Sequence, residues 1–202
     1  MIKNVVFDFG NVLVHFEPNK MVRKYVSDEQ DAKLLEEVVF DRYYWEKLDR
    51  GSMTNEETMA AYRHRLPERL WKIADTIFLN WIYNLPEMEG MHDLIIYIKK
   101  RYRVRTFLLS NISKYFAEHK EEMRILDEID SCIFSAVVGR EKPNRDIFEY
   151  LCQTHKILPE ETVFVDDIAG NVATACELGI TGYQFDGDAE KLKNYLDRVL
   201  NK

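Results

Sequence analysis

The sequence predicts an α/β fold, a doubly wound parallel sheet that carries an inserted all-helical domain. Two observations lead to this fold class. Short apolar runs of four to seven residues alternate with segments of helical periodicity, as in sheets whose strands are linked by helices. An unusually long segment with a helical pattern also follows the first of these runs. The runs are Asn4–Phe9, Val104–Ser110, Ile133–Val138, Thr162–Val165 and Thr181–Phe185.

These apolar runs show little alternation between polar and apolar residues, which is typical of strands buried on both faces of a parallel sheet. Helices are expected between them over Met91–Lys100, Asp146–Cys152 and Val172–Leu178, because apolar side chains recur there with the spacing of one helix face. Gly179 follows the last of these segments and is expected to form its C-terminal cap.

The long helical segment predicts a separate domain. About 95 residues separate the first two strands, whereas a βαβ unit takes about 30. The excess shows helical periodicity and no convincing strand. It predicts a helical cap domain over residues 17–84 and a core domain formed by residues 1–16 and 85–202. Short hinges are expected near His15–Pro18 and Asn84–Gly90.

The net charge and the distribution of apolar residues argue against several classes of protein. The chain has 202 residues and a formal net charge of −7, which argues against a general nucleic-acid binder, because such proteins usually carry a basic patch. No apolar run approaches the roughly 18 residues that a membrane-spanning helix requires. The N-terminus lacks the features of a signal peptide, so a cytoplasmic location is expected. The sequence carries no signal for the oligomeric state.

Polar residues cluster at the C-terminal ends of the predicted strands. In open parallel sheets the ligand crevice lies outside these strand ends, so side chains placed there are expected to meet at one site. The residues are Asp8 at the end of the first strand, Ser110 and Asn111 at the end of the second, and Asp166 and Asp167 after the fourth.

Three carboxylates in one crevice repel one another. At ~4 Å and an effective dielectric constant near 20, each close pair costs about 4 kcal/mol before screening. A bound divalent cation removes this penalty, and oxygen ligands without histidine or cysteine favour Mg²⁺ over zinc. Asp8, Asp166 and Asp167 thus predict a magnesium site. Lys142, in the loop after the third strand, is a candidate to hold a phosphate oxygen and to offset the charge of Asp8.

Four segments of the chain resemble, in order, the four motifs of the haloacid dehalogenase (HAD) superfamily. Each motif is weak alone, whereas four in order, each after a predicted strand, form a specific signal. The resemblance covers the whole chain, because the helical insertion sits where the family carries its type 1 cap. The matching residues are Asp8 within Val6–Leu13, Ser110 within Leu109–Asn111, Lys142 before Pro143, and Asp166 with Asp167 before Ala169–Asn171.

The resemblance implies a phosphohydrolase that acts on a small phosphorylated metabolite. Asp8 would attack phosphorus and form an aspartyl-phosphate, which water then hydrolyses. Ser110, the backbone amide of Asn111 and Lys142 would bind the phosphoryl oxygens, where charge spreads in the transition state.

The same resemblance implies the magnesium ligands Asp8, the backbone carbonyl of Gly10 and Asp167, with Asp166 as an outer ligand or the group that orients a metal-bound water. Gly10 is also a departure from the family pattern. Most family phosphatases have a second aspartate there as general acid and base, and such catalysis is typically worth about 10²–10⁴-fold. Either the leaving group needs little protonation or another group serves, with His15 and a metal-bound water as the nearest candidates.

The Gly-Asn-Val-Leu segment that begins at Gly10 and the Asp166-Asp167 pair resemble a bacterial subgroup that includes an α-glucose-1-phosphate phosphatase. They are also similar to the N-terminal phosphatase domain of mammalian soluble epoxide hydrolase, although that domain keeps the second aspartate. The favoured substrate is therefore a small phosphate monoester, with sugar phosphates as the first candidates.

Two other functions stay open. A metal-independent 2-haloacid dehalogenase of the same superfamily also uses an aspartate nucleophile without the second acid, but the pair Asp166-Asp167 suits magnesium and therefore phosphate. A non-catalytic protein that binds a phosphorylated ligand or a partner would also tolerate the loss of that acid. The presence of both Asp8 and Lys142 argues against this alternative, because binding alone does not require an intact nucleophile.

Overall fold

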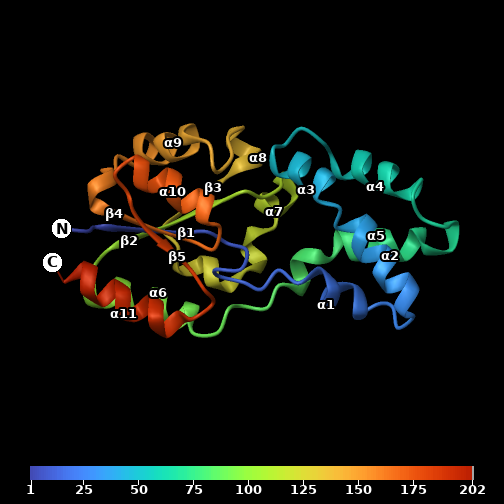
Figure 1. Cartoon of the computed structure of the whole chain (residues 1–202), viewed down its shortest axis with the longest axis horizontal. Helices are drawn as coiled ribbons and strands as arrows, with labels where there is room; N and C mark the ends of the chain where they lie inside the picture. The colour runs from blue at the N-terminus through green and yellow to red at the C-terminus, as the bar shows by residue number, and fades with distance from the viewer. Residues whose placement is uncertain (202) are drawn as a thin grey trace.

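The computed structural model describes residues 1–201 as a three-layer α/β structure with a helical extension at one end (Figure 1). Its strands are β1 (Asn4–Phe7), β2 (Arg105–Ser110), β3 (Ser131–Phe134), β4 (Thr162–Asp166) and β5 (Thr181–Gln184). All neighbouring strands are parallel, in the order β3-β2-β1-β4-β5. The chain therefore starts in the central strand and winds outward in both directions. The predicted fold class is confirmed.

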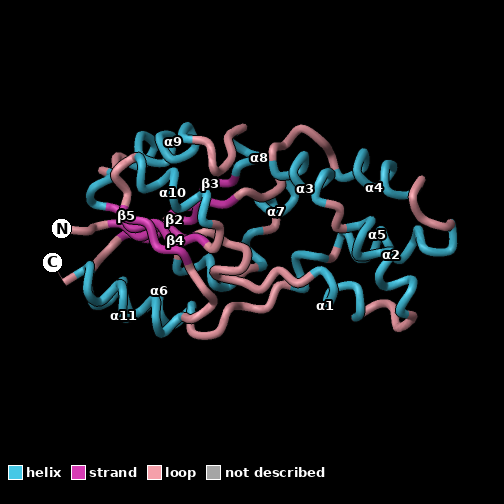
Figure 2. Tube along the Cα trace, viewed as in Figure 1, coloured by secondary structure: helices cyan, strands magenta, loops and turns pink. Residues whose placement is uncertain are grey.

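Helices cover both faces of this sheet (Figure 2). α6 (Met91–Tyr102) and α11 (Ala189–Leu200) lie on one face, whereas α9 (Arg145–His155) and α10 (Ala169–Glu177) lie on the other. Successive residues of a strand point to opposite faces, so Val6 of β1 packs with the second pair of helices while its two neighbours pack with the first pair. Burial on both faces explains the uninterrupted apolar runs of the sequence.

The predicted helices between strands are present as α6, α9 and α10, with ends that lie up to three residues from the expected ones. Gly179 (φ 85°) follows α10 in a left-handed conformation, as expected for a residue that closes a helix. No helix among residues 1–201 is long and apolar enough to cross a membrane. The remaining short elements are α7 (Lys114–Glu118), η3 (Lys120–Glu122), η4 (Arg124–Glu128) and η5 (Pro159–Glu161).

The third apolar run does not form one strand. β3 ends at Phe134, and the next residues form the short helix α8 (Ser135–Val138). The hydroxyl of Ser135 accepts a hydrogen bond from the backbone amide of Ile112, and Gly139 (φ 67°) ends the helix in a left-handed conformation. The prediction of a strand over the whole run was wrong, because a short apolar run does not distinguish a buried strand from a helical turn.

Residues 18–84 form a helical segment with its own apolar cluster, and the structure shows no strand within it. Local sequence sets where its helices begin. Asp28 and Asp41 accept hydrogen bonds from first-turn backbone amides, and Thr54 forms a capping box with Glu57. Its helices are α1 (Pro18–Arg23), α2 (Glu29–Val39), α3 (Arg42–Asp49), α4 (Asn55–Arg63), η1 (Glu68–Leu70), α5 (Trp71–Leu79) and η2 (Trp81–Asn84).

The chain passes between the sheet and the helical segment twice, and the two crossings lie side by side. The backbone amide of His15 donates a hydrogen bond to the carbonyl of Pro86, and the amide of Met88 donates to the carbonyl of Leu13, both at 2.8 Å. These bonds join the crossings at the base of the helical segment, which extends away from the end of the sheet that carries the termini (Figure 1).

Candidate functional site

Three aspartates meet at the C-terminal ends of two central strands. β1 pairs with β4 so that Phe7 lies opposite Val165, and Asp8 and Asp166 are the residues that follow. Asp8, Asp166 and Asp167 each place a carboxylate oxygen within 4.8 Å of the others. Asp8 and Asp166 are buried, whereas Asp167 is partly exposed. The structure thus brings together the three acids that the sequence singles out.

Lys142 lies among these acids. Its side chain is 1% exposed, and its ammonium group lies 2.7 Å from a carboxylate oxygen of Asp8 and 2.6 Å from one of Asp166. Burial lowers the pKa of Lys142, but the negative charges of Asp8 and Asp166 outweigh burial and hold this pKa above its usual value. Lys142 is therefore a charged group that links two acids from different strands.

The pKa values of two of these acids reflect burial and the negative charge that Lys142 does not offset. Burial, opposed by Lys142 and reinforced by Asp166, raises the pKa of Asp8 to about 6. Burial and Asp166 also raise the pKa of Asp167. The three carboxylates can carry more negative charge than one ammonium group offsets, and the metal-binding atoms of the cluster are oxygens. Both features fit a hard divalent cation. A cation held there would lower the pKa values of these acids.

Other groups of the protein already form hydrogen bonds with both carboxylate oxygens of Asp166. Its carboxylate accepts hydrogen bonds from Lys142, from the side-chain amide of Asn171 at 3.0 Å to each oxygen, and from the backbone amide of Ile168 at 2.8 Å. These bonds use the lone pairs that a metal would need and fix the start of α10 against the end of β4. Asp8 and Asp167 are therefore more available to a cation than Asp166.

The end of β2 delivers Ser110 and Asn111, the residues expected to bind phosphate. Ser110 is the last residue of the strand and is buried. The side chain of Asn111 accepts a hydrogen bond from the backbone amide of Lys142 and donates one to its carbonyl, both at 2.8 Å. This clamp ties the loop of Lys142 to β2. The sequence predicts a role only for the backbone amide of Asn111, because nothing local indicates a side-chain partner far along the chain.

Gly10 occupies a position where the fold does not require glycine. A Cβ atom added to Gly10 would have Phe16 Cβ as its neighbour, at 4.0 Å, and the residue does not adopt a left-handed φ. The missing second aspartate is thus a chemical feature and not a steric requirement. His15, one predicted substitute, is tied through its backbone to Pro86, and its ring forms no hydrogen bond or ion pair with residues 1–201.

The helical segment contributes an acid that the sequence does not single out. Asp49 is the last residue of α3, and its backbone carbonyl accepts a hydrogen bond from the hydroxyl of Ser135 at the start of α8. Burial, Glu141 and Asp8 together raise the pKa of Asp49 well above its usual range. Helical periodicity assigns this residue to the insertion, but it does not show which helix end meets the core.

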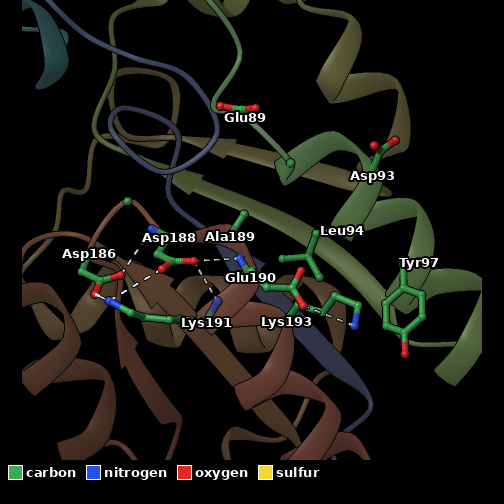
Figure 3. Close-up of a pocket in the computed structure, with 12 residues that line it drawn as sticks. Glu89, Asp93, Leu94, Tyr97, Asp186, Asp188, Ala189, Glu190, Lys191 and Lys193 are labelled. Carbon is green, nitrogen blue, oxygen red and sulfur yellow. Dashed lines mark hydrogen bonds and ion pairs between the residues drawn. The ribbon is translucent and has the colours of Figure 1, made fainter.

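A surface cavity of about 760 Å³ lies between the N-terminal ends of α6 and α11 (Figure 3). Its lysines already have acidic partners, since Lys191 pairs with Asp186 and Asp188, and Lys193 contacts Glu190. The cavity shares no residue with the aspartate cluster. The candidate active site is therefore the cluster at the strand ends.

Known proteins resemble this chain in both sequence and fold. A D-ribitol-5-phosphate phosphatase of Bacteroides thetaiotaomicron is 27% identical, and the match covers 94% of this chain and 95% of that protein. The structure of a predicted HAD-like family hydrolase from Porphyromonas gingivalis has a TM-score of 0.71 and 25% identity, covering 100% of this chain and 99% of the other.

A HAD family enzyme of Bacteroides thetaiotaomicron, solved in complex with magnesium and inorganic phosphate, shares the fold with a TM-score of 0.65 and 21% identity, over 95% of this chain and 99% of the other. The family model for haloacid dehalogenase-like hydrolases matches residues 2–179. That span includes the three aspartates and Lys142. The chain therefore belongs to the haloacid dehalogenase-like hydrolase family.

Proposed function

We propose that this chain is a magnesium-dependent phosphatase that hydrolyses a small phosphate monoester through an aspartyl-phosphate on Asp8. The observation that carries the proposal is the contact between Asp8 and the buried ammonium group of Lys142, beside Asp167 at the strand ends. A nucleophile, a cation for phosphoryl oxygens and a metal-binding acid thus stand in one cluster. The similarity to a D-ribitol-5-phosphate phosphatase supports the same reaction class.

For the metal site we propose Asp8, Asp167 and the backbone carbonyl of Gly10 as ligands. Asp166 takes an outer, orienting role, because Lys142 and other protein groups already bind its oxygens. The bound magnesium ion supplies positive charge that offsets the acids and the phosphoryl group. The related HAD enzyme that was solved with magnesium and phosphate supports this choice of metal.

In the proposed reaction a carboxylate oxygen of Asp8 forms a bond to phosphorus while the bond between phosphorus and the leaving oxygen breaks. Ser110, the amide of Asn111 and Lys142 bind the phosphoryl oxygens, where negative charge spreads in the transition state. Water then attacks the phosphorus of the aspartyl-phosphate, which releases inorganic phosphate and restores Asp8. Only the ionised form of Asp8 attacks, and Lys142 favours that form.

We propose that residues 17–84 are a cap domain on a core formed by residues 1–16 and 85–202. Most buried apolar residues of the helical segment form a cluster of their own, while Met21, Trp81 and Ile82 pack with the larger cluster of the sheet. Both crossings are joined at the base of the segment. Two connections of this kind permit a hinge motion that excludes water from the strand ends during phosphoryl transfer.

The substrate we propose is a small phosphorylated metabolite, with sugar and polyol phosphates as the first candidates. The D-ribitol-5-phosphate phosphatase relative supports this class, and so does the resemblance of the segment after Asp8 to a glucose-1-phosphate phosphatase subgroup. The alcohol of an ordinary phosphate monoester leaves poorly without a proton. This substrate class therefore requires a proton donor in addition to the nucleophile Asp8. The cytoplasmic location stays a prediction.

Phosphate release from a panel of monoesters tests the proposal. The panel holds anomeric sugar phosphates, ordinary sugar and polyol phosphates and an aryl phosphate, each with and without Mg²⁺. Magnesium-dependent release is expected for the wild type and none for Asp8→Asn. Asp127→Asn, an exposed acid of η4, is the matched control and should keep full activity. Release of halide from a 2-haloacid without metal, and no phosphate from any ester, would instead show a dehalogenase.

A further inference from the structure

The end of α3 is docked against the core at three points. The hydroxyl of Ser135 donates a hydrogen bond to the carbonyl of Asp49, and the guanidinium group of Arg50 lies 2.7 and 2.8 Å from the carboxylate oxygens of Glu141. Gly51 packs so closely that a Cβ atom there would lie 2.7 Å from a backbone carbonyl oxygen of α8. These contacts hold Asp49 beside the loop that leads from α8 to the active-site lysine.

Within residues 1–201, Asp49 differs from the acids around it, because its carboxylate has no partner. Glu141 pairs with Arg50, and Glu46 pairs with Arg42 at 2.7 Å. The carboxylate of Asp49 forms no hydrogen bond or ion pair with residues 1–201. The residue is partly exposed.

The acids near Asp49 favour its protonated form. Burial has the largest effect, and the negative charges of Glu141 in the loop before Lys142, of Asp8 after β1 and of Glu46 in α3 add to it. Asp49 also lies at the C-terminus of α3, where the helix dipole disfavours negative charge. Burial acts in the same direction as these charges, and the pKa of Asp49 is well above its usual value.

The cations of this region do not cancel that effect. Arg50 is engaged by Glu141, and Lys142 lies between Asp8 and Asp166. Lys114 of α7 approaches from the core, with its Cε 3.3 Å from the position of a Cβ on Gly51, and it forms no ion pair with residues 1–201. Within residues 1–201, Asp49 is therefore an acid without a hydrogen-bond or ion-pair partner, and its surroundings favour the protonated form.

We infer that Asp49 is the general acid and base of the reaction, an inference that rests on the proposed phosphatase function. The helical segment thus supplies this acid in place of the second aspartate, whose position Gly10 occupies. As Asp8 forms its bond to phosphorus and the bond to the leaving oxygen breaks, that oxygen takes the proton of the Asp49 carboxyl group. In the second half, the Asp49 carboxylate takes a proton from the water that attacks the aspartyl-phosphate. One turnover thus restores both acids.

Two substrates that differ in their need for a proton test this inference. The phenolate of 4-nitrophenyl phosphate leaves without protonation, whereas the alkoxide of a polyol phosphate does not. The ratio kcat/KM is measured for both substrates over a range of pH, with Mg²⁺, for the wild type, Asp49→Asn and Asp49→Ser. Glu56→Gln, an exposed and unpaired acid of α4 in the described structure, is the matched control. Melting temperatures identify any variant that does not fold.

Asp49→Asn and Asp49→Ser are expected to lower kcat/KM for the polyol phosphate by about 10²–10⁴-fold, and that for the aryl phosphate by less than about tenfold. The fall in polyol phosphate hydrolysis at high pH, which reports the loss of the Asp49 proton, is expected to disappear. Adding Gly10→Asp is expected to restore hydrolysis of the polyol phosphate, because the structure has room for a Cβ atom there. Glu56→Gln should change neither ratio.

Equal losses on both substrates would overturn the inference, since Asp49 would then only position α3. A wild type that hydrolyses the aryl phosphate alone, or variants that keep full activity on the polyol phosphate, would overturn it while leaving the phosphatase function intact. Hydrolysis of the aryl phosphate that depends on Asp8 reports the proposed function independently of Asp49. Its absence in the wild type would overturn both proposals.

Discussion

The ammonium group of Lys142 lies 2.7 Å from a carboxylate oxygen of Asp8, and both side chains are buried. Removing two such charges from water costs free energy that only close contact and further hydrogen bonds offset. Asp166 provides a second partner for the ammonium group, and Asn111 fixes the backbone of Lys142. The orientation of Asp8 is therefore set before a substrate binds, which would lower the entropic cost of the proposed attack on phosphorus.

Replacing Lys142 by methionine keeps an unbranched side chain that is one atom shorter and removes its charge. Asp8 and Asp166 then face each other without a counter-ion, and breaking a buried pair typically costs about 3–5 kcal/mol. We expect no turnover and a loss in the free energy of unfolding of that order at pH 7.5. The loss should be smaller at pH 5, where Asp8, with a pKa of about 6, binds a proton. Urea denaturation at both pH values measures this, with exposed Lys72→Met as the control.

Mg²⁺ is expected to stabilise the protein more at pH 7.5 than at pH 5. The pKa of Asp8 is about 6 in the metal-free fold and 3.8 as an ordinary carboxyl group. The folded state therefore holds more protons than the unfolded state between these values, so stability falls as pH rises from about 4 to about 6 and stays lower above. Mg²⁺ competes with the proton on Asp8, so its effect grows over this range.

Thermal denaturation with and without Mg²⁺ at pH 5 and pH 7.5 measures this difference. Asp8→Asn should lose most of the magnesium-dependent rise in Tm, while Asp127→Asn should keep it. An equal rise in Tm at both pH values would contradict the assignment of Asp8 as a metal ligand.

Asn111→Ala is expected to lower kcat through the position of Lys142. The variant keeps its backbone amide but loses both hydrogen bonds to the loop. A misplacement of about 1 Å at an active site costs up to about 10²-fold, so we expect a fall in kcat of about 10–100-fold with a folded protein. Asn111→Asp can still accept a hydrogen bond from the amide of Lys142, so its kcat should lie between those of the wild type and Asn111→Ala. Unchanged kcat in Asn111→Ala would show that the clamp has no part in catalysis.

Gly51→Ala tests whether the docking of α3 on α8 matters for activity. Its Cβ would lie 2.7 Å from a backbone oxygen, and its φ is 69°. Gly187 has a φ of 89° and nothing within 4 Å, so Gly187→Ala carries the backbone strain without the clash. We expect both variants to lose stability, typically about 1 kcal/mol from the left-handed backbone. Only Gly51→Ala is expected to lose more activity than its loss of stability explains. Similar kcat/KM values for the two variants would contradict a role for this contact.

The sequence predicts the core of this protein well for a physical reason. Strands buried on both faces leave continuous apolar runs, and polar residues directly after them must lie at one edge of a parallel sheet. That rule brings Asp8, Asp166 and Asp167 together before any coordinates are known. It fails for Ser135–Val138, because an apolar helical turn and a buried strand look alike over so few residues.

Contacts between distant segments lie beyond local patterns. Asn111 reaches Lys142, and Asp49 reaches the core through Ser135, a residue that lies 86 positions later. Periodicity places α3 within the helical insertion but says nothing about which end of it docks. The sequence therefore predicts His15 or a metal-bound water as the substitute for the missing acid. The structure adds Asp49 of the helical segment as a third candidate, because its carboxylate has no partner within residues 1–201 and its pKa is raised by burial, Glu141 and Asp8.

Trapping the phosphorylated enzyme tests directly whether Asp8 forms an aspartyl-phosphate. The protein is mixed with Mg²⁺ and 4-nitrophenyl phosphate, quenched in acid during turnover, digested and examined by mass spectrometry. We expect a phosphoryl group on Asp8 in the wild type and none in Asp8→Asn. Steady release of phosphate with no phosphorylated Asp8 peptide, or with the label on another residue, would contradict it.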